Sequence, residues 1–376
     1  MSGIYLHIPF CKQACHYCDF HFSTSLKNKE ALVAAICKEL VLRKEELSGV
    51  VKTIYFGGGT PSLLSEEELQ QLFDTIFQHF QVVEHPEITL EANPDDLTSE
   101  KIRQLAQSPI NRLSIGVQSF FESDLKLMNR AHTVSEATLC ITEAQQYFEN
   151  ITIDLIYGIP EMTPARWLQN LEKAFQLNVP HLSCYALTVE PKTALKTFIE
   201  KGIVPPVEDE VAKLHHELLI SETEKRGYVN YEFSNFGKPG YESQNNLAYW
   251  QGKPYLGVGP SAHSYSGSQR SWNVPNNTKY LKAISEGQLP LERETLSVTD
   301  RYNEYVMTRL RTQWGINLEE ITARFGQTYQ AYAWEQAQEH LEEGLLEKDG
   351  TSLRVSAKGK FLSDGIASDL FLVNLK

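Results

Sequence analysis

The sequence has few cysteines and no long apolar run. Six cysteines in 376 residues are too few for a fold held together by disulfides. No apolar stretch reaches the roughly 18–20 residues that a membrane-spanning helix needs. Residues 1–10 also lack the charged and then apolar pattern of a secretory signal. The sequence therefore predicts a cytoplasmic protein without a transmembrane segment.

Basic residues are also scarce relative to acidic ones. The chain has 35 Lys and Arg residues and 48 Asp and Glu residues, which gives a formal net charge of −13. Nucleic-acid backbones are bound by basic faces, and the sequence contains no basic stripe with interleaved aromatic residues. We therefore expect no nucleic-acid partner. The oligomeric state stays open.

The first half of the chain alternates short β-type runs with longer stretches of helical period. The β-type runs are 4–8, 53–56, 88–90, 113–117, 151–156 and 182–187. The helical stretches are 30–47, a segment opened by Ser65 with a capping box to Glu68, 101–107, 135–147 and 164–177. Strands that alternate with helices pair in parallel through crossover helices. Six units are fewer than the eight of a closed barrel, so the pattern predicts an α/β fold with a partial (β/α)6 barrel.

The pattern changes twice after the barrel region. A helical segment at 209–226 is followed by an aromatic, Asn- and Gly-rich stretch at 228–272, which predicts short strands and functional loops. The last part turns helical again and ends in two β-type runs around Asp349-Gly350, a hairpin signal, so it resembles a winged-helix module. We predict a barrel at 1–190, an α+β extension at 191–298 and a winged-helix-like C-terminal module at 299–376.

Three of the cysteines lie close together after the first predicted strand. Cys11, Cys15 and Cys18 have the spacing C-x3-C-x2-C, and loops at the carboxyl ends of barrel strands carry chemistry. Three thiolates can bind three irons of a [4Fe–4S] cubane and leave the fourth iron open. Structural zinc is the alternative, although it usually takes four ligands. The isolated thiols are expected to be buried and inert: Cys37, Cys140 and Cys184.

Further motifs accompany these cysteines along the chain. The sequence GGGTP at 57–61 follows the second predicted strand, and EANP at 91–94, GVQSF at 116–120, MNRAH at 128–132 and DLIYGIP at 154–160 come after it in order. The cysteine motif with GGGTP resembles the radical SAM signature. The whole set resembles the oxygen-independent coproporphyrinogen III oxidase family of radical SAM proteins, and most of all its heme chaperone branch, the HemW family. The resemblance covers essentially the whole chain.

The resemblance implies a radical SAM barrel that binds a [4Fe–4S] cluster and S-adenosyl-L-methionine (SAM). It assigns the cluster to Cys11, Cys15 and Cys18. It implies a SAM pocket lined by Tyr5, Gly58, Gly59, Thr60, Glu91, Gln118, Arg130 and Asp154. Several of these residues lie at carboxyl ends of predicted strands and should therefore converge with the cluster on one face.

Two functions compete under this resemblance. A HemW-like chaperone binds heme and transfers it to acceptor proteins, whereas the oxidases convert coproporphyrinogen III to protoporphyrinogen IX by oxidative decarboxylation. The oxidases carry an N-terminal segment before the cluster motif and a fourth cysteine two residues after the third. Here ten residues precede Cys11, and Phe20 stands in the place of that cysteine. We therefore expect the chaperone, and leave catalytic residues and SAM cleavage open. A third class, a radical SAM enzyme acting on RNA, is disfavoured by the acidic charge.

The residues that would bind heme depart from the family pattern at one position. The family pattern H-N-x-x-Y-W reads Asn245-Asn246-x-x-Tyr249-Trp250 here, and an amide nitrogen has no free lone pair for iron. His263 is the nearest remaining imidazole, with a structural or a ligating role open. Tyr249 and Trp250 are expected to contact heme or to pack in a core. A packing role is expected for the histidines placed on predicted helices: His132, His215 and His216.

Overall fold

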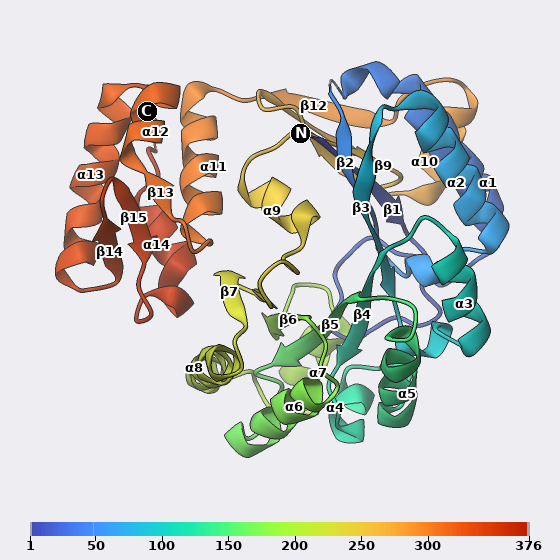
Figure 1. Cartoon of the computed structure of the whole chain (residues 1–376), viewed down its shortest axis with the longest axis horizontal. Coiled ribbons are helices and arrows are strands. Elements are labelled where there is room, and N and C mark those ends of the chain that lie inside the picture. The colour runs from blue at the N-terminus through green and yellow to red at the C-terminus, as the bar shows by residue number, and fades with distance from the viewer. Residues whose placement is uncertain (1, 48, 374–376) are drawn as a thin grey trace.

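A sheet with a parallel centre organises most of the molecule (Figure 1). The computed structural model describes residues 2–47 and 49–373, and within them 12 strands join one sheet in the order β12-β11-β10-β9-β1-β2-β3-β4-β5-β6-β8-β7. Its centre comprises β1 (Ser2–Ile8), β2 (Val51–Gly58), β3 (Val82–Ala92), β4 (Arg112–Gln118), β5 (Asn150–Tyr157) and β6 (His181–Ala186). These strands pair in parallel in chain order. The predicted α/β alternation and its open, barrel-like sheet are confirmed.

Helices cover the outer face of this sheet. They are α1 (Lys29–Leu42), α2 (Glu66–His79), α3 (Ser99–Gln107), α5 (Val134–Ala144) and α6 (Pro164–Gln176). The predicted capping box of Ser65 and Glu68 starts α2. The buried residues of α2 recur at helical spacing, and one of them, Phe73, packs edge-on against Phe56 of β2 at 5.3 Å between ring centroids. This apolar contact fixes the helix on the sheet.

The inner face of the parallel strands is unusually polar. Strands of a parallel sheet are normally apolar on both faces because both are covered. Here Ile54 and Phe56 are fully buried beneath the helices, whereas Tyr55, on the opposite face, donates a hydrogen bond to Glu91. Asp154 alternates in the same way with the buried Ile153 of β5. A polar inner face indicates a barrel interior that receives polar ligands.

Residues 191–298 extend the same sheet at both edges. At one edge β8 (Asn235–Gly237) pairs antiparallel with β6, and β7 (Val229–Glu232) follows. At the other edge β9 (Tyr255–Val258) pairs in parallel with β1 and leads to β10 (His263–Tyr265), β11 (Gln269–Asn273) and β12 (Leu291–Thr295). The short strands were predicted, but their addition to the barrel sheet was not. The division into domains at residues 190 and 298 stays a prediction.

Helices of this region pack on both sides of the added strands. They are α7 (Ala194–Glu200), α8 (Asp209–Lys225), α9 (Gln244–Trp250) and α10 (Asn277–Ser285). Helix α8 packs on α6, α10 packs on α1, and α9 lies between the sheet and the C-terminal part of the chain (Figure 1). The short α4 (Glu122–Leu127) follows β4 and adjoins the cysteine loop.

The last part of the chain forms a small α+β region with its own core. Its elements are α11 (Val298–Leu310), β13 (Ile316–Asn317), α12 (Leu318–Phe325), α13 (Gln327–Glu342), β14 (Leu346–Asp349), β15 (Ser352–Val355) and α14 (Ser363–Asp369). Strands pair in the order β13-β15-β14, so the hairpin predicted at Asp349-Gly350 is present. The C-terminal α+β region is therefore present, and its winged-helix-like character stays a prediction.

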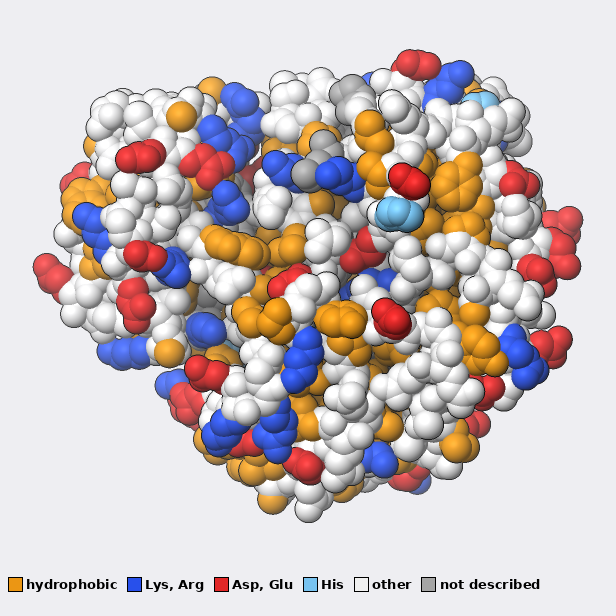
Figure 2. All heavy atoms as spheres, viewed as in Figure 1, with side chains coloured by type: hydrophobic (Ala, Val, Ile, Leu, Met, Phe, Trp, Pro, Cys, Tyr) orange, Lys and Arg blue, Asp and Glu red, His pale blue; other side chains and the backbone are white. Residues whose placement is uncertain are grey.

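The surface mixes charges of both signs. On the face shown in Figure 2, acidic and basic side chains are interspersed rather than segregated. In the described part of the chain, no helix combines the length and the apolar character that crossing a membrane requires.

Candidate functional site

The loop after β1 holds the clustered cysteines against the barrel. The backbone N–H of Cys11 donates to the carbonyl oxygen of Ser23 at 3.0 Å, and that of His16 donates to the carbonyl of Met128 after α4 at 3.1 Å. The loop is thereby tied both to its own return and to the segment that follows β4. The cysteine side chains are half-buried.

All three cysteines line one cavity of about 480 Å³, which we call the cysteine cavity. Its wall also contains most of the residues predicted for SAM: Gly58, Gly59, Thr60, Glu91, Gln118, Arg130 and Asp154. They come from the ends of different parallel strands and the loops after them, as the barrel rule requires. The convergence is as expected, and the assignment of these residues to SAM stays a prediction.

The glycine turn after β2 lies directly against the start of the cysteine loop. The N–H of Gly59 donates to the carbonyl of Ile8 at 3.0 Å. A Cβ on Gly59 would lie 2.8 Å from that oxygen and 2.7 Å from the carbonyl oxygen of Phe10. Gly58 has a φ of +105°, which L side chains rarely adopt. Any larger residue at these positions would therefore push the turn away from the cysteines.

Two carboxylates face the cysteine cavity from β3 and β5. Glu91 accepts hydrogen bonds from the hydroxyl of Tyr55 at 2.8 Å and from the N–H of Gly58 at 3.2 Å. Burial raises the pKa of Glu91. Burial, and then the neighbouring Glu91 charge, raises the pKa of Asp154 to about 7. The side chain of Ser114 donates to Asp154 at 3.3 Å, so both carboxylates are held in place as acceptors for ligand hydroxyl or amino groups.

Arg130 connects the cysteine loop to the barrel. Its guanidinium donates to the Sγ of Cys15 at 3.2 Å, to the Oδ1 of Asn93 at 2.6 Å and to the carbonyl of Gly116 at 2.8 Å. Burial raises the pKa of the Cys18 thiol to about 11. Burial also raises the pKa of Cys11, and the positive charge of Arg130 opposes that rise. Arg130 therefore has a positioning contact with a cysteine besides its place in the predicted SAM wall.

The donor set fits an iron–sulfur cubane better than a single ion. In residues 2–47 and 49–373, no three Cys, His, Asp or Glu side chains converge closely enough to enclose one metal ion. The cysteines instead stand around a shared cavity, and the described part of its wall adds neither a fourth cysteine nor a histidine. A cubane presents its irons at separate corners, so thiolates that stand apart suit it, and its fourth iron would face the cavity.

A neighbouring cavity of about 460 Å³ shares part of its wall with the cysteine cavity. The shared residues are Asp19, Phe20, Gly58 and Glu91. The remaining wall is mostly aromatic and is formed by Tyr5, His7, His21, Tyr249, Tyr255, Ser261 and His263. We call it the aromatic cavity. Tyr5 lies in this neighbouring wall, and its assignment to the SAM pocket stays a prediction.

The residues predicted to contact heme do not all meet. Tyr249 and His263 both line the aromatic cavity. Trp250 is absent from the described wall of that cavity and lines another one beside the C-terminal module. Asn245 is buried, accepts a hydrogen bond from the hydroxyl of Thr53 at 3.1 Å and donates its N–H to Glu87. In this chain position 245 therefore connects α9 to the sheet.

The other histidines have packing environments. The ring of His132 is hydrogen-bonded to the carbonyl of Val117 at 3.0 Å, and it lies in the loop before α5, so its placement on a helix was wrong. His215 and His216 are buried on α8, as predicted. No role was predicted for His7, which lines the aromatic cavity. Its ring is hydrogen-bonded to the hydroxyl of Tyr5 at 3.2 Å. Its signal was the period of two that it shares with Tyr5 on β1.

Known proteins resemble the chain over its whole length. Residues 5–174 match the radical SAM superfamily, and residues 296–362 match the HemN C-terminal domain. The heme chaperone HemW of Bacillus subtilis is 34% identical over 374 residues, an alignment that covers 97% of this chain and 98% of that one. The heme chaperone HemW of Escherichia coli is 35% identical over 318 residues, or 82% of each chain.

A solved structure extends this likeness to the fold. Coproporphyrinogen III oxidase (HemN) from Escherichia coli, a radical SAM enzyme, superposes with a TM-score of 0.86 over 98% of this chain and 90% of its own. Its sequence identity of 24% makes this a statement about fold, because one fold can host several functions.

Proposed function

From the premise that the chain belongs to the HemW family of radical SAM proteins, we propose that it is a heme chaperone that holds a [4Fe–4S] cluster, SAM and heme, and passes heme to acceptor proteins. The observation that carries this proposal is the shared wall of two cavities. The cysteines line one of them, aromatic side chains line the other, and Phe20 and Glu91 belong to both.

Cys11, Cys15 and Cys18 would hold the cluster and leave one iron open for SAM to chelate. When bound, such a cluster supplies an electron that can cleave SAM reductively. The close approach of the Gly59 backbone to the cysteine loop supports a role in receiving the amino acid end of SAM. Glu91, held by Tyr55 and Gly58, is an acceptor suited to ribose hydroxyls.

The aromatic cavity would hold heme. A flat macrocycle stacks on aromatic side chains, and the rings of Tyr249 and Tyr255 meet edge to face in its wall, 4.6 Å apart between centroids. His263 is exposed on β10 and lines the cavity, so its imidazole would be available as an iron ligand. His7 is buried and its ring is bonded to Tyr5 and to the carbonyl of His21. We therefore assign the iron ligand to His263.

The first test concerns the cluster. The protein is reconstituted anaerobically with iron and sulfide, and bound iron and the visible absorption of the cluster are measured. Changing Cys11, Cys15 and Cys18 together to Ala should abolish both signals. Cys37→Ala is the matched control, because Cys37 is buried in α1, and it should keep both. Iron retained in the triple variant would exclude these ligands.

The second test separates the chaperone from the oxidase on one reconstituted sample. Heme is titrated by its absorption, and coproporphyrinogen III is supplied with SAM and a reductant. We expect heme binding without decarboxylation. His263→Ala should weaken heme binding and shift the heme absorption band. His85→Ala is the control, since His85 is exposed on β3 and outside the described walls of both cavities. Efficient decarboxylation without heme binding would overturn the proposal in favour of the oxidase.

A further inference from the structure

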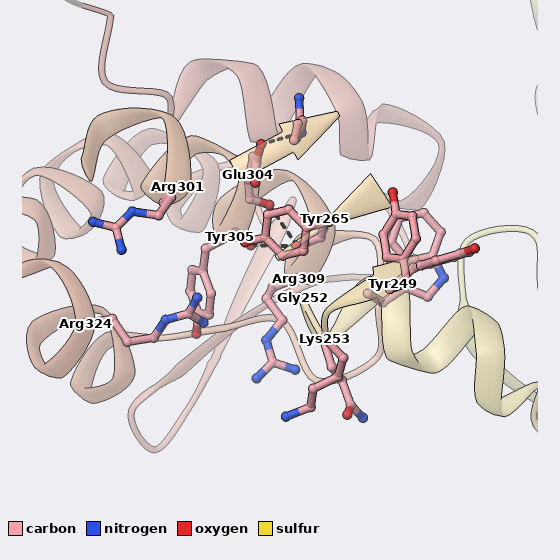
Figure 3. A pocket seen from close by; sticks show the side chains of 14 residues that line it. Tyr249, Gly252, Lys253, Tyr265, Arg301, Glu304, Tyr305, Arg309 and Arg324 are labelled. Carbon is pink, nitrogen blue, oxygen red and sulfur yellow. Dashed lines mark hydrogen bonds and ion pairs between the residues drawn. The ribbon is translucent and has the colours of Figure 1, made fainter. Parts of the chain in front are cut away.

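A basic cavity lies between the end of α9 and the C-terminal module (Figure 3). Helices α9 and α11 pack together beside it. Its basic lining residues are Lys253, Arg270, Arg301, Arg309 and Arg324. Its aromatic lining residues are Tyr249, Trp250, Tyr255, Tyr265 and Tyr305. Such a concentration of positive charge is unexpected on a chain whose formal net charge is −13.

Carboxylates neutralise only part of this charge. Arg270 is paired with Glu304, near which Asp300 and Glu294 also lie. A single carboxylate, Glu320, accepts from both Arg309 at 2.9 Å and Arg324 at 3.0 Å.

Two of the basic lining residues have no acidic partner in the part of the chain that the structure describes. Within residues 2–47 and 49–373, neither Lys253 nor Arg301 forms a side-chain ion pair. Figure 3 shows the side chain of Lys253, after α9, and that of Arg309, on α11, extending in the same direction. The cavity is therefore suited to an anionic ligand.

One lining residue, Trp250, also carries a buried donor. The indole Nε1 of Trp250 is buried and has no hydrogen-bond partner among the described residues. Buried N–H groups are normally paired. The indole is also stacked under the guanidinium of Arg311, 5.5 Å from its ring centroid.

The basic cavity continues the aromatic cavity. Tyr249 and Tyr255 line both, so the two cavities adjoin at these rings, and a ligand that reached past the rings would enter both. The aromatic cavity, at about 460 Å³, lies in the range of sites for whole small ligands, whereas the basic cavity, at about 160 Å³, is below it. The smaller cavity therefore suits the acidic substituents of a ligand whose body lies next door.

We propose that the basic cavity binds the propionate carboxylates of a heme whose macrocycle occupies the aromatic cavity. This inference rests on the proposed heme binding and adds the group that orients the ligand. Heme carries its two propionates on one edge, so their capture by Lys253 and Arg301 fixes which edge points to the C-terminal module.

The test uses the full chain, reconstituted with its cluster, and two probes: hemin and hemin dimethyl ester, which lacks the carboxylates. The double variant Lys253→Ala/Arg301→Ala removes the basic groups that lack an acidic partner. The matched control is Lys52→Ala/Arg103→Ala, which removes the same charges from exposed positions on β2 and α3. Retained iron–sulfur absorption shows that each variant is folded.

We expect the wild type to bind hemin at least about tenfold more tightly than the ester, since one hydrogen bond to a charged group strengthens binding by about tenfold or more. The double variant should bind hemin about tenfold or more weakly than the wild type and bind the ester as the wild type does. It should therefore no longer distinguish hemin from its ester. The control should behave like the wild type. A double variant that still discriminates like the wild type, or that loses both probes equally, overturns the propionate assignment alone. A wild type that binds neither probe overturns the proposed heme binding as well.

Discussion

A buried ion pair connects the barrel to the strands that carry His263. The carboxylate of Glu39, on α1, lies 2.9 Å from the guanidinium of Arg43, just after α1. Their side chains are 0% and 1% exposed. The guanidinium of Arg43 also donates to the carbonyl of Gly257 at 2.9 Å and to the hydroxyl of Ser264 at 3.0 Å. The pair thus joins α1 to β9 and β10, which form one wall of the aromatic cavity.

Replacing Arg43 by Leu would leave the carboxylate of Glu39 buried without its counter-charge. Glu39 would keep hydrogen bonds from the N–H of Gly259 at 2.8 Å, the Nδ2 of Asn273 at 2.7 Å and the hydroxyl of Tyr280 at 2.6 Å. Removing one partner of a buried pair costs about 3–5 kcal/mol. With an m-value of about 3 kcal/mol/M, the urea midpoint should fall by about 1–1.7 M.

Urea unfolding followed by circular dichroism and tryptophan fluorescence measures this shift. Lys196→Leu is the control, because Lys196 and Glu200 form an exposed pair at 3.6 Å, and such pairs contribute about 1 kcal/mol or less. The double variant Glu39→Leu/Arg43→Leu should recover part of the loss, since it leaves no unpaired buried charge. A midpoint shift for Arg43→Leu no larger than that of Lys196→Leu would refute the reasoning.

Two further predictions concern the cysteine cavity. Gly59→Ala should weaken SAM binding to the reconstituted protein, because the added Cβ meets two backbone carbonyl oxygens. Equilibrium dialysis measures the SAM affinity, and Gly365→Ala is the control because a Cβ there lies in open space. An unchanged SAM affinity in Gly59→Ala would contradict the prediction. Asp154→Asn should change the pH dependence of stability. The pKa of Asp154 is raised to about 7 in the folded state. Between about pH 4 and pH 7 the folded protein therefore keeps a proton on Asp154 that the unfolded chain has released. The wild type thus loses stability relative to the variant as the pH rises through this range. Urea midpoints of both proteins at pH 5 and pH 8 test the sign, and an equal difference at the two pH values would show that the raised pKa is absent.

The parallel strands and the convergence of their carboxyl ends could be predicted from the sequence. The period of two and the intervening helices define the strands, and parallel strands bring their ends to one edge. Glu91 and Asp154 therefore meet beside the cysteines although 62 residues separate them in the printed sequence. What the pattern does not encode is depth within the barrel. Tyr5 lies on the right strand and face, yet it borders the neighbouring cavity.

The pairing of β9 with β1 could not be read from local pattern, because the two strands are far apart in the chain and β9 is only Tyr255–Val258. The separation of Tyr249 from Trp250 has a simpler origin. The stretch around them was interpreted as strands and loops, but it forms the helix α9. Successive residues on a helix point about 100° apart, so among the described cavity walls Tyr249 reaches both the aromatic and the basic cavity, whereas Trp250 lines the basic cavity alone.

Phe20 gives a physical reason to regard the cysteine and aromatic cavities as one functional unit. Its side chain is 68% exposed, although large apolar residues are usually buried, and it lies in the walls of both cavities. A ligand in either cavity would cover part of this ring and gain the free energy of removing it from water. Two ligands that cover the same ring compete for it or pack against each other across it. We therefore expect binding in the cysteine cavity and binding in the aromatic cavity to be coupled through the exposed ring of Phe20.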